Sequence, residues 1–338
     1  MRAGVYRGPD TIKVEDWPGP RLASGEVLVK VRYAGICGSD ILIRRGKHPR
    51  VVPPRVLGHE IFGAVAETNV PGDAGLSLGT RVAVYPLISC GQCAPCREGA
   101  SHVCETLRLI GIDVDGGIAE FVKAQPDQLF LVPDSVSDEQ AALVEPLSVA
   151  VHAVRTSGFR PGDTALVTGA GPIGNLIAQV LRASGARAIV VSEVKDFRRE
   201  LAERMGFRVV NPAREPLRET LQRVAGGPFV DRVYEATGGA SAYRDAVQAC
   251  RVRGEIILVG LPKTPPEVDV LNLVFKEIRS TGARVYERRD YQVAIALLER
   301  GAVDVAPLIT DRLPLEDAER GFQKMQEADT SLKILFAP

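Results

Sequence analysis

Short apolar runs rich in valine mark the first part of the chain, and glycine or proline separates one run from the next. Runs of four to eight residues with β-branched side chains, bounded by turn residues, are typical of strands. Residues 1–147 therefore predict a β-rich domain. We expect its strands at 27–31, 63–67, 81–85 and 128–132.

The pattern changes near Glu145-Pro146, where proline suits the first turn of a helix over 147–156. Beyond it, short buried apolar runs alternate with stretches of helical periodicity. Strands that alternate with helices predict a parallel, doubly wound sheet over residues 148–285. The expected strands are 164–168, 188–192, one at Val209, 230–236, 255–259 and 280–284, and the expected helices are 172–184, 196–205 and 240–251.

The last residues return to mixed structure, with amphipathic helices expected over 291–300 and 315–326 and a closing strand over 333–336. We expect residues 286–338 to fold back on the β-rich domain. The predicted fold class is α/β, with a β-rich domain beside a doubly wound one.

The charge composition argues against some classes of binding partner. Basic and acidic residues balance at 42 each, so no overall field would attract nucleic acid or an anionic membrane. The sequence has no apolar run near the ~20 residues that span a bilayer, and its start lacks the apolar core of a secretion signal. Four of the six cysteines cluster, which favours a reducing cytoplasm and metal ligation.

The clustered cysteines follow one another with turn-forming residues between them: Cys90, Cys93, Cys96 and Cys104. Four thiolates at this spacing can close a tetrahedron around Zn²⁺. The alternative is a disulfide-bonded loop, which fits less well because cysteines two residues apart pair only with strain. Cys250 lies in a helical apolar pattern and is expected to be a small buried hydrophobic residue.

A glycine-rich turn joins the expected strand 164–168 to the following helix. Gly169, Gly171 and Gly174 match G-x-G-x-x-G in the strand–helix context that a dinucleotide pyrophosphate requires. Glu193 ends the next strand and would bind the ribose hydroxyls of NAD, although it could instead be a solvated acid. Arg198 could stack near the adenine or neutralise the 2′-phosphate of NADP, and with Glu193 in place we expect NAD.

A second set of possible ligands is spread more widely: Cys37 in Cys-Gly-Ser-Asp, His59 and Glu60 in Gly-His-Glu, and Glu145 in Val-Glu-Pro-Leu. One thiolate, one imidazole and one or two carboxylates suit Zn²⁺ with a position left open. Taken singly, Cys37 could be a buried thiol, His59 a structural histidine and Glu145 an acid at the start of its helix.

In this order, these motifs and the four-cysteine loop resemble the zinc-containing medium-chain alcohol dehydrogenases, in particular the sorbitol and threonine dehydrogenase branch. The resemblance runs the full length of the chain. It implies a GroES-like catalytic domain, a Rossmann domain, an active site in the cleft between them, and a dimer or tetramer. It also implies two zinc ions per chain: a catalytic zinc bound by Cys37, His59 and Glu60, with Glu145 as an alternate or fourth ligand, and a structural zinc bound by Cys90, Cys93, Cys96 and Cys104.

The implied chemistry is hydride transfer between a secondary alcohol and NAD, with zinc as the Lewis acid. Ser39 would take the alcohol proton, and Asp40 would orient His59 or merely form a turn. Many relatives have a histidine where this chain has Leu42, so His48 either replaces it or is an ordinary loop residue. The positions that line the nicotinamide in relatives correspond here to Ile173, Val259, Leu261 and Val285.

A basic loop bears on the substrate. Arg44, Arg45 and Lys47 could hold a carboxylate or phosphate, so an acidic sugar derivative competes with a neutral polyol or an amino-alcohol. The same charges could simply be solvated. The alternatives to a NAD-dependent dehydrogenase are a non-catalytic zinc- and nucleotide-binding protein and an NADP-preferring enzyme. The neutral net charge disfavours a nucleic-acid-binding zinc finger, and both ligand sets disfavour a zinc-free quinone reductase.

Overall fold

The computed structural model describes residues 1–70, 75–327 and 330–338, and the chain divides into two compact units. Residues 1–145, 287–299 and 308–338 form the first, which we call the β unit. Residues 146–286 and 300–307 form the second, the α/β unit.

Most strands of the β unit belong to one sheet with the path β10-β6-β5-β3-β18-β17, and β9 also pairs with β3. Strand β18, from the end of the chain, pairs antiparallel with β3, from its beginning. The strands are β1 (Arg2–Gly8), β2 (Thr11–Asp16), β3 (Val27–Gly35), β4 (Arg55–Val56), β5 (Glu60–Thr68), β6 (Arg81–Val84), β7 (Leu87–Ile88), β8 (Arg108–Leu109), β9 (Phe121–Ala124), β10 (Leu129–Leu131), β17 (Ile309–Pro314) and β18 (Lys333–Ala337).

The β unit also has short helices. One of them, α1, is not expected from the sequence because Gly38-Ser-Asp is typical of a turn. Helix α10 returns to the unit because Tyr291 donates a hydrogen bond to the carbonyl of Val84 (3.0 Å). Its ring also packs against Tyr85 and Phe130. The helices are α1 (Gly38–Arg44), α2 (Ala94–Arg97), α3 (Asp138–Ala141), α10 (Arg288–Glu299) and α11 (Ala318–Glu327).

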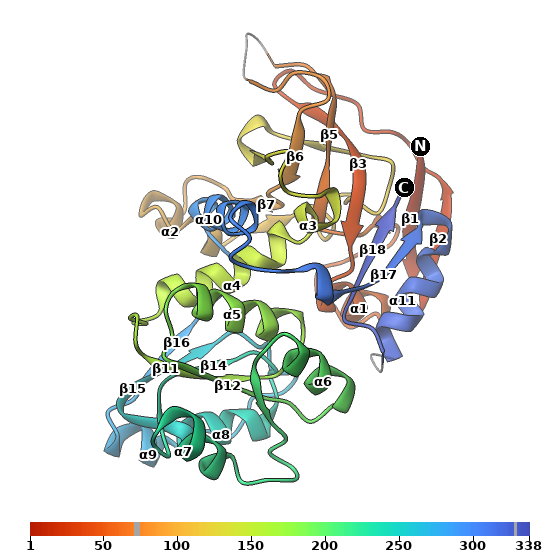
Figure 1. Ribbon diagram of the computed structural model, residues 1–338. Coiled ribbons are helices and arrows are strands. Elements are labelled where there is room, and N and C mark those ends of the chain that lie inside the picture. Colours follow the sequence, from red (N-terminus) through yellow and green to blue (C-terminus); the bar gives the residue numbers. More distant parts are fainter. Residues whose placement is uncertain (71–74, 328–329) are drawn as a thin grey trace. The chain divides into compact units, whose positions relative to one another are not determined.

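The α/β unit is a six-stranded parallel sheet with the order β13-β12-β11-β14-β15-β16. Helix α5 packs on one face, and α7 and α8 pack on the other (Figure 1). The strands are β11 (Thr164–Thr168), β12 (Ala188–Ser192), β13 (Arg208–Val210), β14 (Val230–Glu235), β15 (Cys250–Leu258) and β16 (Arg279–Gly282), and the helices are α4 (Val144–Thr156), α5 (Pro172–Ala183), α6 (Asp196–Arg204), α7 (Leu217–Ala225), α8 (Ala240–Ala249) and α9 (Val270–Phe275).

This order is that of a doubly wound dinucleotide-binding sheet, and it reverses between β11 and β14. Apolar side chains of β11, β12 and β14 form its core with those of α7 and α8, including Leu166, Val190, Leu221, Val233 and Val247. Parallel strands buried on both faces explain why the sequence shows continuous apolar runs here rather than alternation.

One segment lies outside the expected boundaries. Residues 300–307, expected with the C-terminal part of the chain, belong to the α/β unit. The buried amide of Gln179 on α5 explains why, because it donates to the carbonyl of Asp304 (3.0 Å) and accepts from its N–H (2.8 Å). Such a paired contact satisfies both polar groups of a buried side chain.

Candidate functional site

The four clustered cysteines lie together in one loop of the β unit. The Sγ atoms of Cys90 and Cys96 are 4.0 Å apart, and those of Cys93 and Cys104 are 3.8 Å apart. All four sulfur atoms lie within 4.8 Å of one another, and none is in a disulfide. A tetrahedron with zinc–sulfur bonds of about 2.3 Å has edges of about 3.8 Å. The loop therefore has the dimensions of a closed zinc site.

Backbone N–H groups prepare this loop for thiolates. Those of Gln92 and Cys93 lower the pKa of Cys90 to about 6. The N–H of Cys90 in turn lowers the pKa of Cys104. Burial, followed by competition with neighbouring thiols, raises the pKa of Cys96 to about 12. A dication would let all four sulfurs lose their protons together, because a coordinating thiol is deprotonated.

The candidate ligands Cys37, His59 and Glu60 come together because β3 and β5 are neighbouring strands. Strands β3 and β5 pair antiparallel, with Gly35 opposite Glu60. Cys37 follows β3 and precedes α1, and His59 immediately precedes β5, so the pairing brings Cys37 close to His59 and Glu60. Glu145 lies in the first turn of α4 and is buried.

His59 is buried among anions. Burial alone would lower the pKa of His59, but the charges of Asp40, Cys37 and Glu145 raise it well above its ordinary value of 6.5. The Nδ1 atom of His59 lies 3.8 Å from Oδ1 of Asp40, and both atoms are buried without a hydrogen-bond partner. This cluster of anions around an imidazole suits a bound cation.

Asp40 has a second role in the same turn. Its Oδ2 atom accepts a hydrogen bond from the N–H of Cys37 (2.9 Å), which fixes the start of α1. Burial raises the pKa of Asp40. The carboxylate thus bonds to the backbone of Cys37 and faces the ring of His59 at 3.8 Å, a position from which it could orient that ring once a metal is bound.

The ligand atoms of this second set are farther apart than those of the four-cysteine loop. Within the described part of the chain, the ligand atoms of Cys37, His59 and the two carboxylates do not all lie within 4.8 Å of one another. A metal ion would therefore have to draw the side chains together, whereas the cysteine loop is already closed. Ser39, the expected proton acceptor, is half-buried in the first turn of α1.

Lys333 is a member of this site that the sequence does not reveal. Its Nζ atom, buried in β18, lies 2.5 and 2.7 Å from the two carboxylate oxygens of Glu60 and 3.0 Å from the carbonyl of Ile36. Burial opposes the charge, but Glu60 and Cys37 raise the pKa of Lys333. Gly35 leaves the necessary space, because a Cβ there would lie 2.1 Å from Oε2 of Glu60.

The glycine-rich turn has the geometry expected for a pyrophosphate. Gly169 follows β11 with φ of +91°, and α5 begins at Pro172. A Cβ at Gly174 would lie 1.9 Å from the carbonyl oxygen of Gly169, so only glycine permits the close turn. The first turn of α5 offers backbone N–H groups and the positive end of the helix dipole.

Two charged side chains flank this turn. Glu193 accepts hydrogen bonds from the N–H groups of Ala170 (2.9 Å), Val194 (2.8 Å) and Lys195 (2.9 Å). Arg198 lies close to the turn, because its Nη1 would be 3.7 Å from a Cβ at Gly171. The Nε atom of Arg198 is buried without a hydrogen-bond partner. A ribose or phosphate at this position would supply one.

The expected nicotinamide-lining residues follow the strands of the same sheet. Ile173 is half-buried in the first turn of α5, and Val259 follows β15. Leu261 lies two residues further on and is 85% exposed. Val285 follows β16 and has a positive φ of 47°, a strained conformation for a β-branched residue.

The basic loop is smaller than the sequence suggests. Arg44 is buried, donates to Asp10 and Gln326, and pairs with Glu319 at 2.6 Å, so it holds the fold and cannot bind a substrate. This corrects the grouping of Arg44 with Arg45 and Lys47. The latter two make no ion pair among the described residues.

His48 lies in the loop after α1 and is half-buried. Burial, followed by the charge of Arg50, lowers the pKa of His48. Its Nδ1 accepts a hydrogen bond from the N–H of Arg50 (3.3 Å), which leaves Nε2 to carry the ring proton.

The part of the chain that the structure describes holds no helix that is both long and apolar enough to cross a membrane.

Comparisons with known proteins agree with this geometry. Two family models match: the alcohol dehydrogenase GroES-like domain over residues 23–134 and the zinc-binding dehydrogenase over residues 172–300. The chain is 37% identical to a 2-dehydro-3-deoxy-L-galactonate 5-dehydrogenase of Pseudoalteromonas atlantica, covering 99% of this chain and 98% of the relative. It is 33% identical to a sorbitol dehydrogenase of Bacillus subtilis, covering 100% and 97%. Among solved structures, 2R,3R-butanediol dehydrogenase from Bacillus subtilis matches with a TM-score of 0.91 at 30% identity, covering 100% and 99%.

Proposed function

This chain belongs to the zinc-dependent medium-chain alcohol dehydrogenases, and we propose that it transfers a hydride between a secondary alcohol of the polyol, sugar-acid or amino-alcohol class and NAD. The observation that carries the proposal is the set of half-buried Cys37 with buried His59 and Glu145, in a unit that also holds the closed cysteine loop. A zinc ion in the open set supplies a Lewis acid for the alcohol oxygen.

The chain's own residues do the rest. Cys37 and His59 would hold the ion, and Glu145 would be the third protein ligand in place of the expected Glu60. Lys333 already neutralises Glu60, which stays beside the site as the alternate ligand. Asp40 faces the Nδ1 side of the His59 ring at 3.8 Å. Ser39 would be the first carrier of the alcohol proton, taking it up as its own hydroxyl proton passes on to solvent.

NAD is the proposed cofactor because an acid ends β12. Glu193 lies beside the glycine turn, where a carboxylate repels a 2′-phosphate. Solved relatives include one complexed with NADH and one bound to NADP, so the choice depends on this chain's residues. Replacing Glu193 with Ala should lower the ratio of kcat/KM with NAD to kcat/KM with NADP. An unchanged ratio would show that Glu193 does not contribute to the choice of cofactor.

The direct test is formation of NADH by the purified, zinc-loaded protein over a panel of polyols, sugar acids, sugar phosphates, amino-alcohols and inositols. Turnover with one class and a zinc content of two per chain would support the proposal. A protein that holds two zinc ions and binds NADH but oxidises none of these alcohols would support the non-catalytic alternative.

Within that panel we propose that a sugar acid is the better substrate. Arg45 and Lys47 remain as unpaired cations of the loop after α1 among the described residues, and a carboxylate would pair with them. A relative named for a sugar-acid substrate is 37% identical to this chain. Replacing both residues with Ala should lower kcat/KM for sugar acids by about tenfold or more and leave neutral polyols unchanged. Equal losses for both classes would refute the assignment.

We also propose a cytoplasmic homo-oligomer. The four residues of β16 are exposed, and among the described residues no strand pairs with its outer edge. Next to it, α9 turns an apolar face outward through Val270, Leu271, Val274 and Phe275. A second copy pairing along β16 would cover both features. Phe275→Asp should yield monomers by sedimentation velocity, whereas the matched exposed change Leu78→Asp should not; dimers that survive Phe275→Asp would exclude this surface.

A further inference from the structure

A buried carboxylate stands at the carboxyl end of the central strand β14. Glu235 is the last residue of β14 and is fully buried. It forms no ion pair with any described residue. Burying an unpaired charge costs several kcal/mol unless hydrogen bonds satisfy it, so a carboxylate in this position needs an explanation.

Hydrogen-bond donors replace the missing cation. Oε1 of Glu235 accepts from the N–H (2.8 Å) and the hydroxyl (2.5 Å) of Thr237, and from the N–H of Gly238 (3.0 Å). The hydroxyl of Thr168, at the end of β11, lies 3.3 Å away. Several donors on one carboxylate make strong charge-assisted bonds, which fix the loop 237–239 in one conformation.

Loop 237–239 packs between the ends of β11 and β15. A Cβ at Gly169, in the glycine turn, would lie 2.7 Å from Cγ2 of Thr237. A Cβ at Gly260, after β15, would lie 2.2 Å from the N–H nitrogen of Gly238 and 2.7 Å from Oε2 of Glu235. The backbone carbonyl of Glu235 also accepts from Val259 and Gly260 (2.8 Å each). Glu235 therefore connects the ends of β11, β14 and β15.

We propose that Glu235 is a positioning residue for the dinucleotide, a role that rests on the proposed function. Ligands of doubly wound sheets bind beyond the carboxyl ends of the strands. The carboxylate holds loop 237–239 against Gly169 on one side and against residues 259–261 on the other. It thereby sets the distance between the pyrophosphate turn and the strand-end loop, without itself touching the cofactor.

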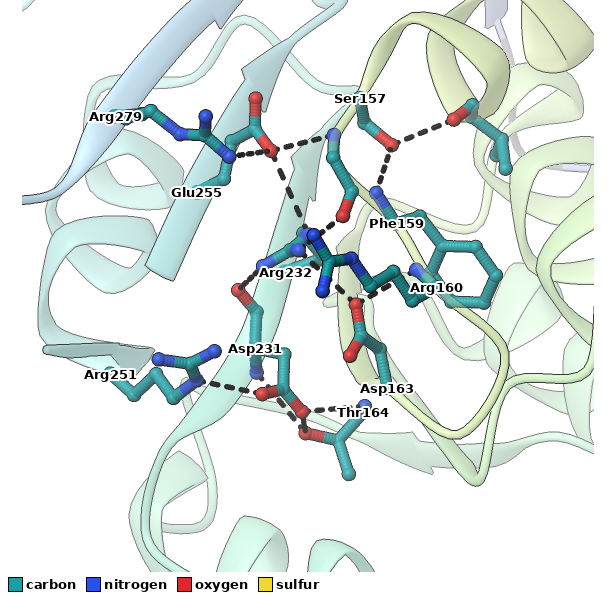
Figure 2. Close-up of polar contacts among 12 residues, drawn as sticks. Ser157, Phe159, Arg160, Asp163, Thr164, Asp231, Arg232, Arg251, Glu255 and Arg279 are labelled. Carbon is teal, nitrogen blue, oxygen red and sulfur yellow. Dashed lines mark hydrogen bonds and ion pairs between the residues drawn. The ribbon is translucent and has the colours of Figure 1, made fainter. Parts of the chain in front are cut away.

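The neighbouring strand offers a matched control. Glu255 on β15 is also buried, but it lies in register with Arg232 and Arg279 near the amino ends of their strands. It lies 3.6 Å from Arg232 and 3.5 Å from Arg279, two contacts drawn in Figure 2. It also accepts a hydrogen bond from the N–H of Gly158 (2.7 Å). Glu255 is thus held by cations, away from the strand ends that face the glycine turn.

The experiment compares Glu235→Gln with Glu255→Gln in the full-length, zinc-loaded protein. The N–H of Gly238 also donates to Oε2 of Glu235 (3.1 Å). Glutamine keeps an oxygen for the donors at Oε1 but replaces Oε2 with an NH₂ group that faces this N–H, which loosens the loop. We expect the Kd for NADH and the KM for NAD to rise by about tenfold in Glu235→Gln, with kcat at saturating NAD changed by less than about threefold. Glu255→Gln should lower Tm and leave the Kd for NADH unchanged.

Two outcomes overturn the inference. One is a folded Glu235→Gln variant whose Kd for NADH stays within twofold of wild type, and the other is an equal loss of affinity in Glu255→Gln. If Glu235→Gln does not fold, Thr237→Val removes a single donor and must weaken NADH binding in the same direction. A folded Thr237→Val variant with wild-type affinity overturns it as well. A wild-type protein that binds no NADH would instead refute the proposed function.

Discussion

The two candidate metal centres of the β unit are built in opposite ways. The cysteine loop comes from one short stretch, Cys90 to Cys104, and its sulfur atoms already have the spacing of a zinc tetrahedron. The second centre takes Cys37, His59 and Glu145 from three separate segments, and they do not yet converge to that spacing. The first ranges from exposed Cys90 to buried Cys104, whereas in the second His59 and Glu145 are buried and Cys37 is half-buried.

The number of protein ligands decides whether a zinc site can only stabilise the fold or can also bind a substrate. Four thiolates fill every position of a tetrahedral ion, so nothing else can bind. A site with three protein ligands leaves a position for an alcohol, and burial strengthens every charge interaction within it. The second centre therefore needs the supporting groups that the first lacks: Asp40 on His59 and Lys333 on Glu60.

The largest expected effect comes from removing the thiolate of the open centre. Cys37→Ser should lower kcat by at least about 10³-fold, because loss of the Lewis acid forfeits several kcal/mol of transition-state stabilisation. NADH binding, followed by fluorescence, should persist, because the glycine turn lies in the α/β unit.

The matched control is Cys250→Ala, which removes a buried thiol of the α/β unit and should keep turnover. If Cys37→Ser turned over at the wild-type rate, the open centre would have no role in the reaction and the contrast between the two centres would disappear.

The second-largest expected effect comes from breaking the ion pair between Lys333 and Glu60, which has no counterpart at the cysteine loop. Lys333→Met leaves Glu60 charged and buried without its cation, which should lower the free energy of unfolding by about 3–5 kcal/mol. The measurement is chemical denaturation of the metal-loaded protein. The double variant Lys333→Met/Glu60→Gln should recover most of the loss, because the uncompensated charge is gone. Additive losses in the double variant would show that the pair is not a unit.

The sequence predicts the local features of this molecule and misses the assembled ones. The cysteine loop and the glycine turn are formed by consecutive residues, so their spacing alone indicates their chemistry. Lys333 is invisible in the sequence because it meets Glu60 only through the pairing of β18 with β3, which brings together residues 273 positions apart. The network of Glu235 is hidden for the same reason, since three strand ends create it.

For Arg44 the sequence predicts a role that the structure contradicts. Its neighbours Arg45 and Lys47 make it look like part of a solvent-exposed basic loop, but helical geometry turns it inward to Glu319 on α11. A run of like charges in sequence therefore does not establish a patch in space, because adjacent helical residues point in different directions.

A smaller effect should follow from opening the closed centre. Cys104→Ser removes the buried sulfur of the loop, so the zinc content should fall from two per chain to one, and Tm should fall. The kcat of the chains that remain folded should stay near wild type, because the loop takes no part in the reaction. Zinc analysis with a Tm measurement tests this. Loss of both ions with full loss of kcat would mean that the two centres form one cooperative site.

The smallest effect tests the orientation of His59. Asp40→Asn removes the anion opposite Nδ1 of His59 and should weaken zinc binding at the open centre by about 10–100-fold. It should also change the pH dependence. In the metal-free wild type the pKa of His59 is raised, so the ring holds a proton at neutral pH that zinc must displace, and occupancy falls as the pH falls.

Without Asp40 the pKa of His59 is lower, so protons compete less and the occupancy curve of Asp40→Asn should be flatter above the ordinary histidine pKa of 6.5. The measurement is equilibrium dialysis against buffered zinc, with the ion at the cysteine loop as internal reference. Curves of equal slope would show that Asp40 affects the start of α1 alone, through its bond to Cys37, and does not act on His59. In that case the open centre would rely on the pairing of β3 with β5 for its geometry, as the cysteine loop relies on its own sequence.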